Sequence, residues 1–157
     1  MQIRPITAAD TWPIRHLAMW PERDPAFVRL PGDDDAEHFG LCAGRQADAP
    51  LISVISLFRG DGDAQFRKFA TLPEAQGMGH GSALLQFLVR HAQAQSLRRL
   101  WCNARVERSP FYARHGFAPA GATFQKNGRD YIRMEYVRME QVRMDRVSME
   151  HETARTE

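Results

Sequence analysis

The stretch from Gln65 to Gln95 constrains the fold of this chain more than any other. A strand-like run over 65–72 stops at Pro73, and an amphipathic pattern begins at Ser82. Between them glycines alternate, at positions 77, 79 and 81. Glycine allows a positive φ and a close approach of backbone N–H groups to an anion, and a helix start adds partial positive charge. The stretch therefore predicts a strand, a glycine-rich turn and a helix that together can bind a phosphate group without a lysine.

Three helices are predicted, and the strongest pattern runs over 82–95. Its apolar face consists of residues at i, i+3, i+4 and i+7, namely Leu84, Phe87, Leu88 and His91. A second helix is expected from Ala8 to Met19, with Thr7 and Asp10 as a capping box at its start. A short third helix opens at Ser109–Pro110, with the serine as its N-cap.

Strand-like runs alternate with turn signals through the rest of the chain. They cover residues 1–6, 38–43, 51–58, 65–72, 98–105, a run that begins at Phe117, and 131–137. Short turns separate the runs over 38–43, 51–58 and 65–72, which favours an antiparallel meander of three strands. Residues 20–35 are irregular, and a loop of this length in a small domain is often functional.

Composition and charge exclude several classes of protein. A chain of 157 residues with 43% hydrophobic and 25% charged residues is typical of one globular domain. The net charge of +2 and the dispersed basic residues do not favour a nucleic-acid partner. Two distant cysteines, Cys42 and Cys102, form neither a disulfide framework nor a metal-binding spacing, so no metal is expected. Apolar runs are too short for a membrane span or a leader, so we expect a soluble cytoplasmic protein with no membrane partner.

Two common phosphate-binding folds do not fit the glycine-rich turn. A nucleotide-binding P-loop ends in Gly-Lys-Ser or Gly-Lys-Thr, whereas this chain has His80-Gly81-Ser82. A dinucleotide-binding fold carries an acidic residue at the end of the next strand to bind a ribose hydroxyl. The strand-like run over 98–105 contains no acidic residue.

The chain resembles the GNAT N-acetyltransferase superfamily. The run Gln76-Gly-Met-Gly-His-Gly81 is similar to that family's pyrophosphate signature, which is Arg or Gln, two residues, Gly, one residue, and Gly or Ala. Downstream, Asn103 followed by Phe111-Tyr112 and Gly116-Phe117 resembles its second conserved block. The resemblance covers about residues 3–137. It implies an α+β fold of the GNAT type, with a mixed, mostly antiparallel central sheet flanked by helices.

The resemblance also implies a reaction and a set of site residues. Acetyl-CoA would be the acyl-donor cosubstrate, and its acetyl group would pass directly to a primary amine in a ternary complex. Backbone groups at a bulge over Phe69, Ala70 and Thr71 would bind the pantetheine amide and polarise the thioester carbonyl. The pyrophosphate would be held by Gln76, Gly77, Met78, Gly79, His80, Gly81 and Ser82. Asn103 would contact the pantetheine arm, and Tyr112 would be the general acid that protonates the departing thiolate.

The general base and the acceptor are less defined. The family's usual base is a carboxylate beside the central strand, but this strand offers only Gln65, Arg67 and Lys68. Glu22, Glu37, His38 or a water chain could serve instead. We expect a small-molecule amine, because residues 20–35 are long enough to cover a pocket and Asp33–Asp35 could attract a protonated amine. A solvated turn is the alternative for that acidic run.

Two other functions and a homodimer remain as alternatives. The domain could be a non-catalytic sensor that binds acyl-CoA, although a sensor has no need of an acid such as Tyr112. It could also be an interaction module that acts through its C-terminal tail.

The C-terminal tail has an unusual repeat. Residues 131–150 divide into four similar pentads, beginning with Tyr-Ile-Arg-Met-Glu. A period of five keeps apolar residues on one face of neither a strand nor a helix. We therefore expect a GNAT domain over 1–137 and a repetitive polar tail over 138–157 that is helical or disordered. A helical tail that binds a partner is the alternative.

Overall fold

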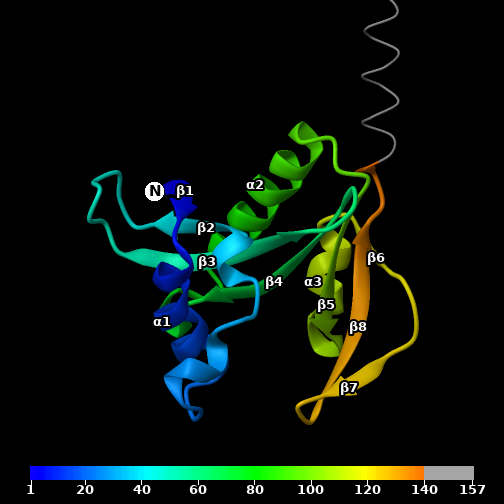
Figure 1. The fold of residues 1–157 in the computed structure, drawn as a ribbon, viewed down its shortest axis with the longest axis horizontal. Coiled ribbons are helices and arrows are strands. Elements are labelled where there is room, and N and C mark those ends of the chain that lie inside the picture. The colour runs from blue at the N-terminus through cyan, green and yellow to red at the C-terminus, as the bar shows by residue number, and fades with distance from the viewer. Residues whose placement is uncertain (140–157) are drawn as a thin grey trace, which may run out of the picture. The chain divides into compact units, whose positions relative to one another are not determined.

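The computed structural model describes residues 1–139, which form strands and helices (Figure 1). The main elements are β1 (Gln2–Ile6), α1 (Ala8–Met19), β2 (Glu37–Cys42), β3 (Leu51–Arg59), β4 (Asp63–Thr71), α2 (His80–Ala94), β5 (Arg99–Arg105), α3 (Ser109–Arg114), β6 (Phe117–Pro119), β7 (Phe124–Lys126) and β8 (Arg129–Tyr136). Four short 3-10 turns join them: η1 (Pro25–Val28), η2 (Asp33–Asp35), η3 (Pro73–Ala75) and η4 (Val106–Arg108). The strand pairs are mostly antiparallel and helices lie beside them, which confirms the predicted α+β class.

The chain divides into two compact units. One contains residues 1–60 and 65–88, and the other contains 61–64 together with the chain from Val89 onward. In the first unit the strands are neighbours in the order β1, β2, β3, β4, with antiparallel β1–β2 and β2–β3 pairs. This unit carries the whole glycine-rich turn.

Two helices cover opposite faces of the strands in the first unit. Ile14 of α1 packs into a buried cluster with Val54 of β3 and Ala70 of β4. Phe39 of β2 makes an edge-to-face contact with Phe87 of α2, at 5.2 Å between ring centroids. Because Val54 lies opposite Gly40, it shares a face with even-numbered residues of β2, whereas Phe39 points to the other side. One face therefore belongs to α1 and the other to α2.

The start of α1 is set by its cap. The Thr7 hydroxyl accepts a hydrogen bond from the Asp10 backbone N–H at 3.2 Å, and the Asp10 carboxylate accepts one from the Thr7 N–H at 3.0 Å. This is the reciprocal capping box that the sequence predicts, and it satisfies two N–H groups that a helix start would otherwise leave unpaired.

The second unit is built around β8. This strand pairs antiparallel with β5, β6 and β7, and the register places Asn103 opposite Arg133. Its buried core includes Leu100, Cys102 and Met134. The β7 strand was absent from the predicted elements.

Several predicted boundaries differ from the structure. Helix α2 begins at His80 rather than Ser82, so the end of the glycine signature is helical. Ser109 is not the N-cap of α3 but its first residue, and its hydroxyl donates to the Val106 carbonyl at 2.8 Å. The tail repeats from residue 140 lie outside the described residues. Within the described part of the chain, no helix is long and apolar enough to cross a membrane.

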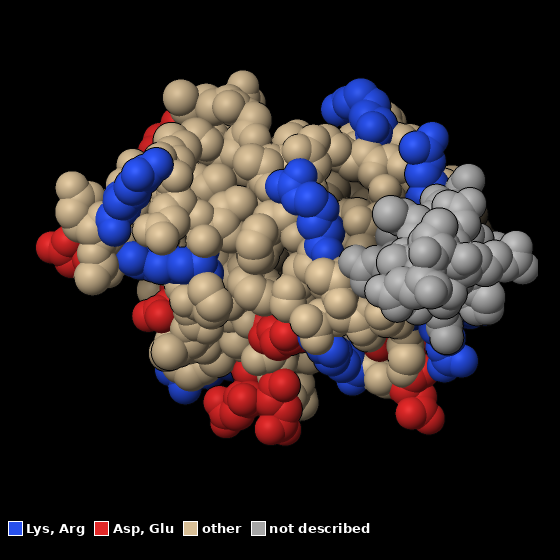
Figure 2. All heavy atoms as spheres, turned by 90° about the horizontal axis from the view of Figure 1, so that it is seen from above, with Lys and Arg blue, Asp and Glu red and all other residues tan. Residues whose placement is uncertain are grey.

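The charges on one face of the molecule do not form a single patch. On the face drawn in Figure 2, basic side chains stand apart from one another rather than forming one stripe. Across residues 1–139, no three His, Cys, Asp or Glu side chains are grouped so that they could hold a metal ion.

Candidate active site

A β-bulge interrupts β4 at Lys68. This residue has a φ of 53°, in the left-handed region that non-glycine residues seldom adopt. In a regular strand Phe66 and Phe69 would point to opposite faces, yet their rings meet edge-to-face at 6.4 Å between centroids. The irregular residue therefore precedes the predicted stretch Phe69–Thr71 directly and shifts the side-chain alternation of the residues that follow it.

Hydrogen bonds from β3 hold two of the three residues after the bulge, Ala70 and Thr71. The Ser53 hydroxyl donates to the Ala70 carbonyl at 3.1 Å and lies 2.8 Å from the Thr71 hydroxyl. Just beyond them, the Leu72 N–H donates to the Ile52 carbonyl at 2.9 Å. Ser53 was not predicted as a site residue, although a serine inside the apolar run Leu51–Phe58 is the signal that could have shown it.

The glycine-rich turn is open to solvent and has a defined backbone. Gly77 and Gly79 have φ values of 76° and 84°, and a Cβ added to either would meet no atom within 4 Å. Gln76 joins the turn to the strand, because its side-chain amide donates to the Thr71 carbonyl at 3.0 Å. Met78 is 66% exposed despite its apolar side chain. The backbone of the turn is therefore accessible to a ligand on its outer side.

The turn leads directly into the first residues of α2. The Ala83 N–H donates to the Gly79 carbonyl at 3.1 Å, which starts the helical hydrogen bonding. A Cβ added to Gly81 would lie 3.3 Å from the Phe69 ring, so glycine permits the close approach of helix and strand. His80 and Ser82 flank it and are partly buried. Open glycines followed by a helix start suit a phosphate anion.

Asn103 and Tyr112 belong to the second unit. Asn103 is exposed on β5, whereas Tyr112 is partly buried on α3 and packs edge-to-face on Phe111 and Phe117. Burial raises the pKa of the Tyr112 hydroxyl above its ordinary value, and the Cys102 thiol adds to the rise. The nearby positive charges of Arg108 and Arg105 only partly oppose it. Tyr112 is therefore a neutral phenol at physiological pH.

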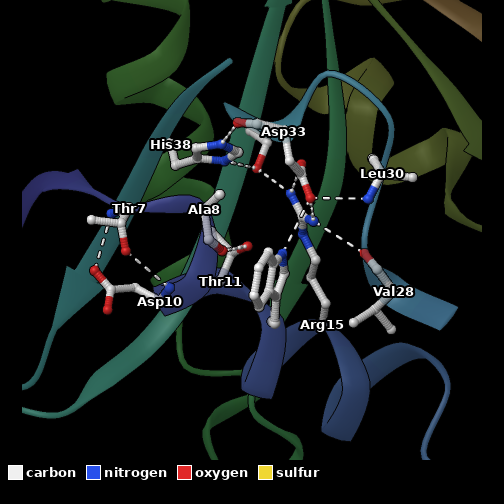
Figure 3. A network of polar contacts seen from close by, with 11 residues as sticks. Thr7, Ala8, Asp10, Thr11, Arg15, Val28, Leu30, Asp33 and His38 are labelled. Atoms are coloured by element: carbon white, nitrogen blue, oxygen red, sulfur yellow. Dashed lines mark hydrogen bonds and ion pairs between the residues drawn. The ribbon is translucent and has the colours of Figure 1, made fainter. Parts of the chain in front are cut away.

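A buried ion pair ties the segment over 20–35 to α1 (Figure 3). The Arg15 guanidinium is fully buried and donates to both Asp33 carboxylate oxygens, at 2.8 and 3.0 Å. It also donates to the Val28 carbonyl at 3.1 Å and to the Ser56 hydroxyl at 2.9 Å. The Asp33 carboxylate further accepts from the Leu30 N–H at 2.9 Å. The acidic run is thus not a uniform rim, because Asp33 points inward.

His38 belongs to the same network. Its Nε2 donates to the Asp33 carbonyl at 2.7 Å, so its Nδ1 accepts from the Ser56 hydroxyl at 2.7 Å. Both ring nitrogens are occupied in a buried site, which argues against His38 as the general base. Glu37 is paired with Arg59 through two hydrogen bonds, at 2.7 and 3.1 Å. The expected base candidates that remain are exposed Glu22, a water chain, and Glu37, whose ion pair with Arg59 is partly exposed.

A glycine-rich turn between an irregular strand and a helix is the arrangement that the resemblance to acetyl-CoA-dependent transferases leads us to expect. The chain matches the family model described as Acetyltransferase (GNAT) domain over residues 36–138. The match spans more than half of the chain, which therefore belongs to the GNAT family of acetyl-CoA-dependent N-acetyltransferases. The resemblance drawn from the sequence is confirmed.

Three proteins similar to this chain share 18–26% of its sequence. The uncharacterized N-acetyltransferase YitI of Bacillus subtilis (strain 168) is 26% identical over 135 residues, covering 82% of this chain and 89% of that protein. A GNAT family acetyltransferase from Elizabethkingia anophelis with acetyl-CoA bound has a TM-score of 0.64 at 18% identity, covering 85% of this chain and 95% of that one. A spermidine N-acetyltransferase SpeG chimera from Vibrio cholerae and hSSAT has a TM-score of 0.67 at 20% identity, covering 90% and 96%. The two structures show a shared fold.

Proposed function

We propose that this GNAT enzyme transfers the acetyl group of acetyl-CoA directly to a small primary amine. The observation that carries the proposal is the open, left-handed backbone at Gly77 and Gly79, placed between the bulged strand β4 and the start of α2. A pyrophosphate has the charge and size that such a turn accepts, because the donors are backbone N–H groups that cost no reorganisation. Gln76, Met78, His80, Gly81 and Ser82 complete this proposed site.

The bulged strand would hold the other end of the cosubstrate. Bound acetyl-CoA supplies a thioester whose carbonyl carbon forms a bond to the amine nitrogen while its bond to sulfur breaks. Backbone groups at Phe69, Ala70 and Thr71 would bind the pantetheine amide and polarise that carbonyl. The bonds from Ser53 fix this strand end in advance, which is the condition for such donors to be effective.

Two residues of the second unit complete the proposal. Asn103 would contact the pantetheine arm, and Tyr112 would give its proton to the departing sulfur. A raised pKa keeps the Tyr112 hydroxyl protonated, as a general acid must be, but it also makes the phenol a weaker acid. The ordinary pKa of a thiol is about 8.5, so proton transfer depends on positioning and on charge that develops as the sulfur departs.

Direct transfer is favoured over an acetylated enzyme. Both cysteines are free and buried, and burial raises the pKa of the Cys102 thiol. A nucleophilic cysteine needs a lowered pKa and access to the substrate, whereas the pKa of Cys102 is raised and both thiols are buried. The amine would therefore attack acetyl-CoA itself, after losing its proton to water, to Glu22 or to Glu37.

A small acceptor remains part of the proposal. The spermidine enzyme in the comparison acts on a small polyamine by name, but a likeness of 20% identity does not carry its acceptor over to this chain. We expect thiol release when acetyl-CoA is incubated with a panel of small amines. Binding of acetyl-CoA without thiol release, for every amine tested, would instead support the non-catalytic sensor.

A further inference from the structure

Arg67 is a partly buried cation on β4, next to the bulge. Its guanidinium carbon lies 5.7 Å from the centre of the Phe58 ring, which belongs to the neighbouring strand β3. An aromatic face supports a guanidinium there and leaves its N–H groups free to bind in the plane. Within residues 1–139, no carboxylate forms an ion pair with Arg67.

Arg67 projects from the face that α1 covers. Side chains two residues apart share a face of a strand, so Phe58 lies on the same side as Ser56. Ser56 accepts a hydrogen bond from Arg15 of α1 on that side. The bulge at Lys68 explains how Arg67 joins this face while Phe66 and Phe69 share the opposite one.

The charge of Arg67 is not neutralised by its charged neighbours. Burial and the neighbouring Arg15 guanidinium lower the pKa of Arg67, and the Asp33 carboxylate opposes them only in part. The Asp33 carboxylate does not pair with Arg67, because its two oxygens already accept hydrogen bonds from Arg15, Trp12 and the Leu30 N–H. Arg15 and Asp33 are buried and paired with each other, so an anion from outside would meet the Arg67 guanidinium alone.

We propose that Arg67 binds a carboxylate of the acceptor, and hence that the acceptor is an amino acid with a free amine. The inference rests on the proposed function. Only the bulge residue Lys68 separates Arg67 from Phe69, so their backbones lie at most about 7 Å apart. That span suits an acceptor whose carboxylate lies a few bonds from its amine, held by a two-pronged hydrogen bond. In this proposal Arg67 attracts the acceptor through its carboxylate, in place of the expected attraction of a protonated amine to Asp33–Asp35.

The test compares amino acids with their carboxamides. Specificity constants are measured by thiol release for glycine, phenylalanine and glutamate and for the matching α-amides, with wild type and Arg67→Gln. A larger fraction of the amine is unprotonated in the amides than in the acids at neutral pH. We therefore compare, between the two proteins, the ratio of the specificity constant for the acid to that for its amide, because the difference in protonation is the same for both proteins and cancels. We expect this ratio to fall about 10- to 100-fold in Arg67→Gln, the size typical of a hydrogen bond to a charged group.

Two further variants sharpen the comparison. Arg67→Lys keeps the charge but loses the planar guanidinium. Its acid-to-amide ratio should lie between those of wild type and Arg67→Gln. Arg59→Gln removes the same charge from β3, on the opposite face of that strand, and should leave the ratio unchanged. An equal ratio in wild type and Arg67→Gln, or an equal fall in Arg59→Gln, would overturn the inference.

A binding measurement separates this inference from the proposed function. Calorimetry with acetyl-CoA should give the same affinity for wild type and Arg67→Gln. Calorimetry with N-acetylphenylalanine and its amide needs no turnover, and it should show a preference for the acid in wild type that Arg67→Gln loses. If wild type prefers the acid in calorimetry but shows no turnover, the proposed function alone is overturned. If wild type shows no preference for N-acetylphenylalanine over its amide, the carboxylate site is overturned.

Discussion

The Arg15–Asp33 pair is closed to water, with side chains 0% and 6% exposed. Replacing Asp33 by Asn keeps the shape but leaves a buried guanidinium without its counter-charge. Breaking a buried pair in this way costs about 3–5 kcal/mol. We expect Asp33→Asn to lower the melting temperature by about 10 °C or more at this chain length. Asp34→Asn is the matched control, since Asp34 is exposed, and should melt as wild type does.

The same pair predicts a pH dependence of stability. Although burial alone would raise it, hydrogen bonds from Arg15, Leu30 and Trp12 hold the pKa of the Asp33 carboxyl below its ordinary value. A lowered folded-state pKa gives stability that is present above the unfolded pKa, about 3.9, and is lost as pH falls through the folded one. The difference in melting temperature between wild type and Asp33→Asn should thus persist at pH 5 and shrink below about pH 4. A difference that disappears between pH 7 and 5 would contradict this assignment.

Tyr112 is the residue on which the proposed chemistry depends most directly. Tyr112→Phe keeps the ring contacts with Phe111 and Phe117 but removes the proton donor. We expect kcat to fall by about 10²–10⁴, with acetyl-CoA affinity by calorimetry nearly unchanged. Tyr136→Phe is the control, because it removes a hydroxyl from the same unit. An unchanged kcat for Tyr112→Phe would assign the proton to water.

At the scale of elements, the strand, turn and helix around the glycines form the proposed pyrophosphate-binding site. Gly79→Asp and Gly79→Asn impose the same strain at a φ of 84°, and both side chains would enter open space. Only the aspartate places a negative charge beside the proposed pyrophosphate. We expect Gly79→Asp to abolish acetyl-CoA binding in calorimetry, and Gly79→Asn to retain measurable binding. Equal affinities in the two variants would remove the pyrophosphate from this turn.

Elements with local signals were predictable. Thr7 and Asp10 stand three residues apart and define the start of α1, and the apolar spacing of α2 gave that helix to within two residues. The missed strand β7 also had a local signal, because Asn127 and Gly128 both have positive φ, as a tight hairpin turn requires. An Asn-Gly pair between two polar runs was the clue.

Parts of the site had no local signal. The glycine-rich turn follows from its own residues, whereas Arg15 and Asp33 stand 18 positions apart with no period that links them. The same holds for Arg67. The face of β4 on which its side chain lies depends on the bulge at Lys68, and no residue type predicts that bulge. A left-handed lysine is held by its surroundings, and propensity does not predict it.

At the scale of the whole molecule, the division into a domain over 1–137 and a tail over 138–157 stays a prediction. Strand β8 ends at Tyr136, and Met139 is buried, so a chain that ends at Glu140 keeps both. Since a period of five cannot present one continuous apolar face, we expect this truncation to shift the melting temperature by less than about 3 °C. A fall of about 10 °C would show that the repeats pack. A chain that ends at Ile132 cuts β8 and should fail to fold.

The buried ion pair also divides the segment over 20–35 into a part that can be exchanged and a part that cannot. Residues 21–26 are exposed, whereas the Val28 carbonyl, the Leu30 N–H and the Asp33 carboxylate are all bonded within the buried network. The backbone bonds of residues 21–26 lie at the exposed surface: the Arg23 N–H donates to the Trp20 carbonyl at 3.1 Å, and the Arg23 carbonyl lies 2.8 Å from His16 Nε2. Exposed backbone of this kind tolerates exchange better than backbone bonded within a buried network. A protein engineer who grafts a foreign loop onto this enzyme can therefore replace the stretch from Pro21 to Ala26. The buried bonds of Val28, Leu30 and Asp33 must be kept.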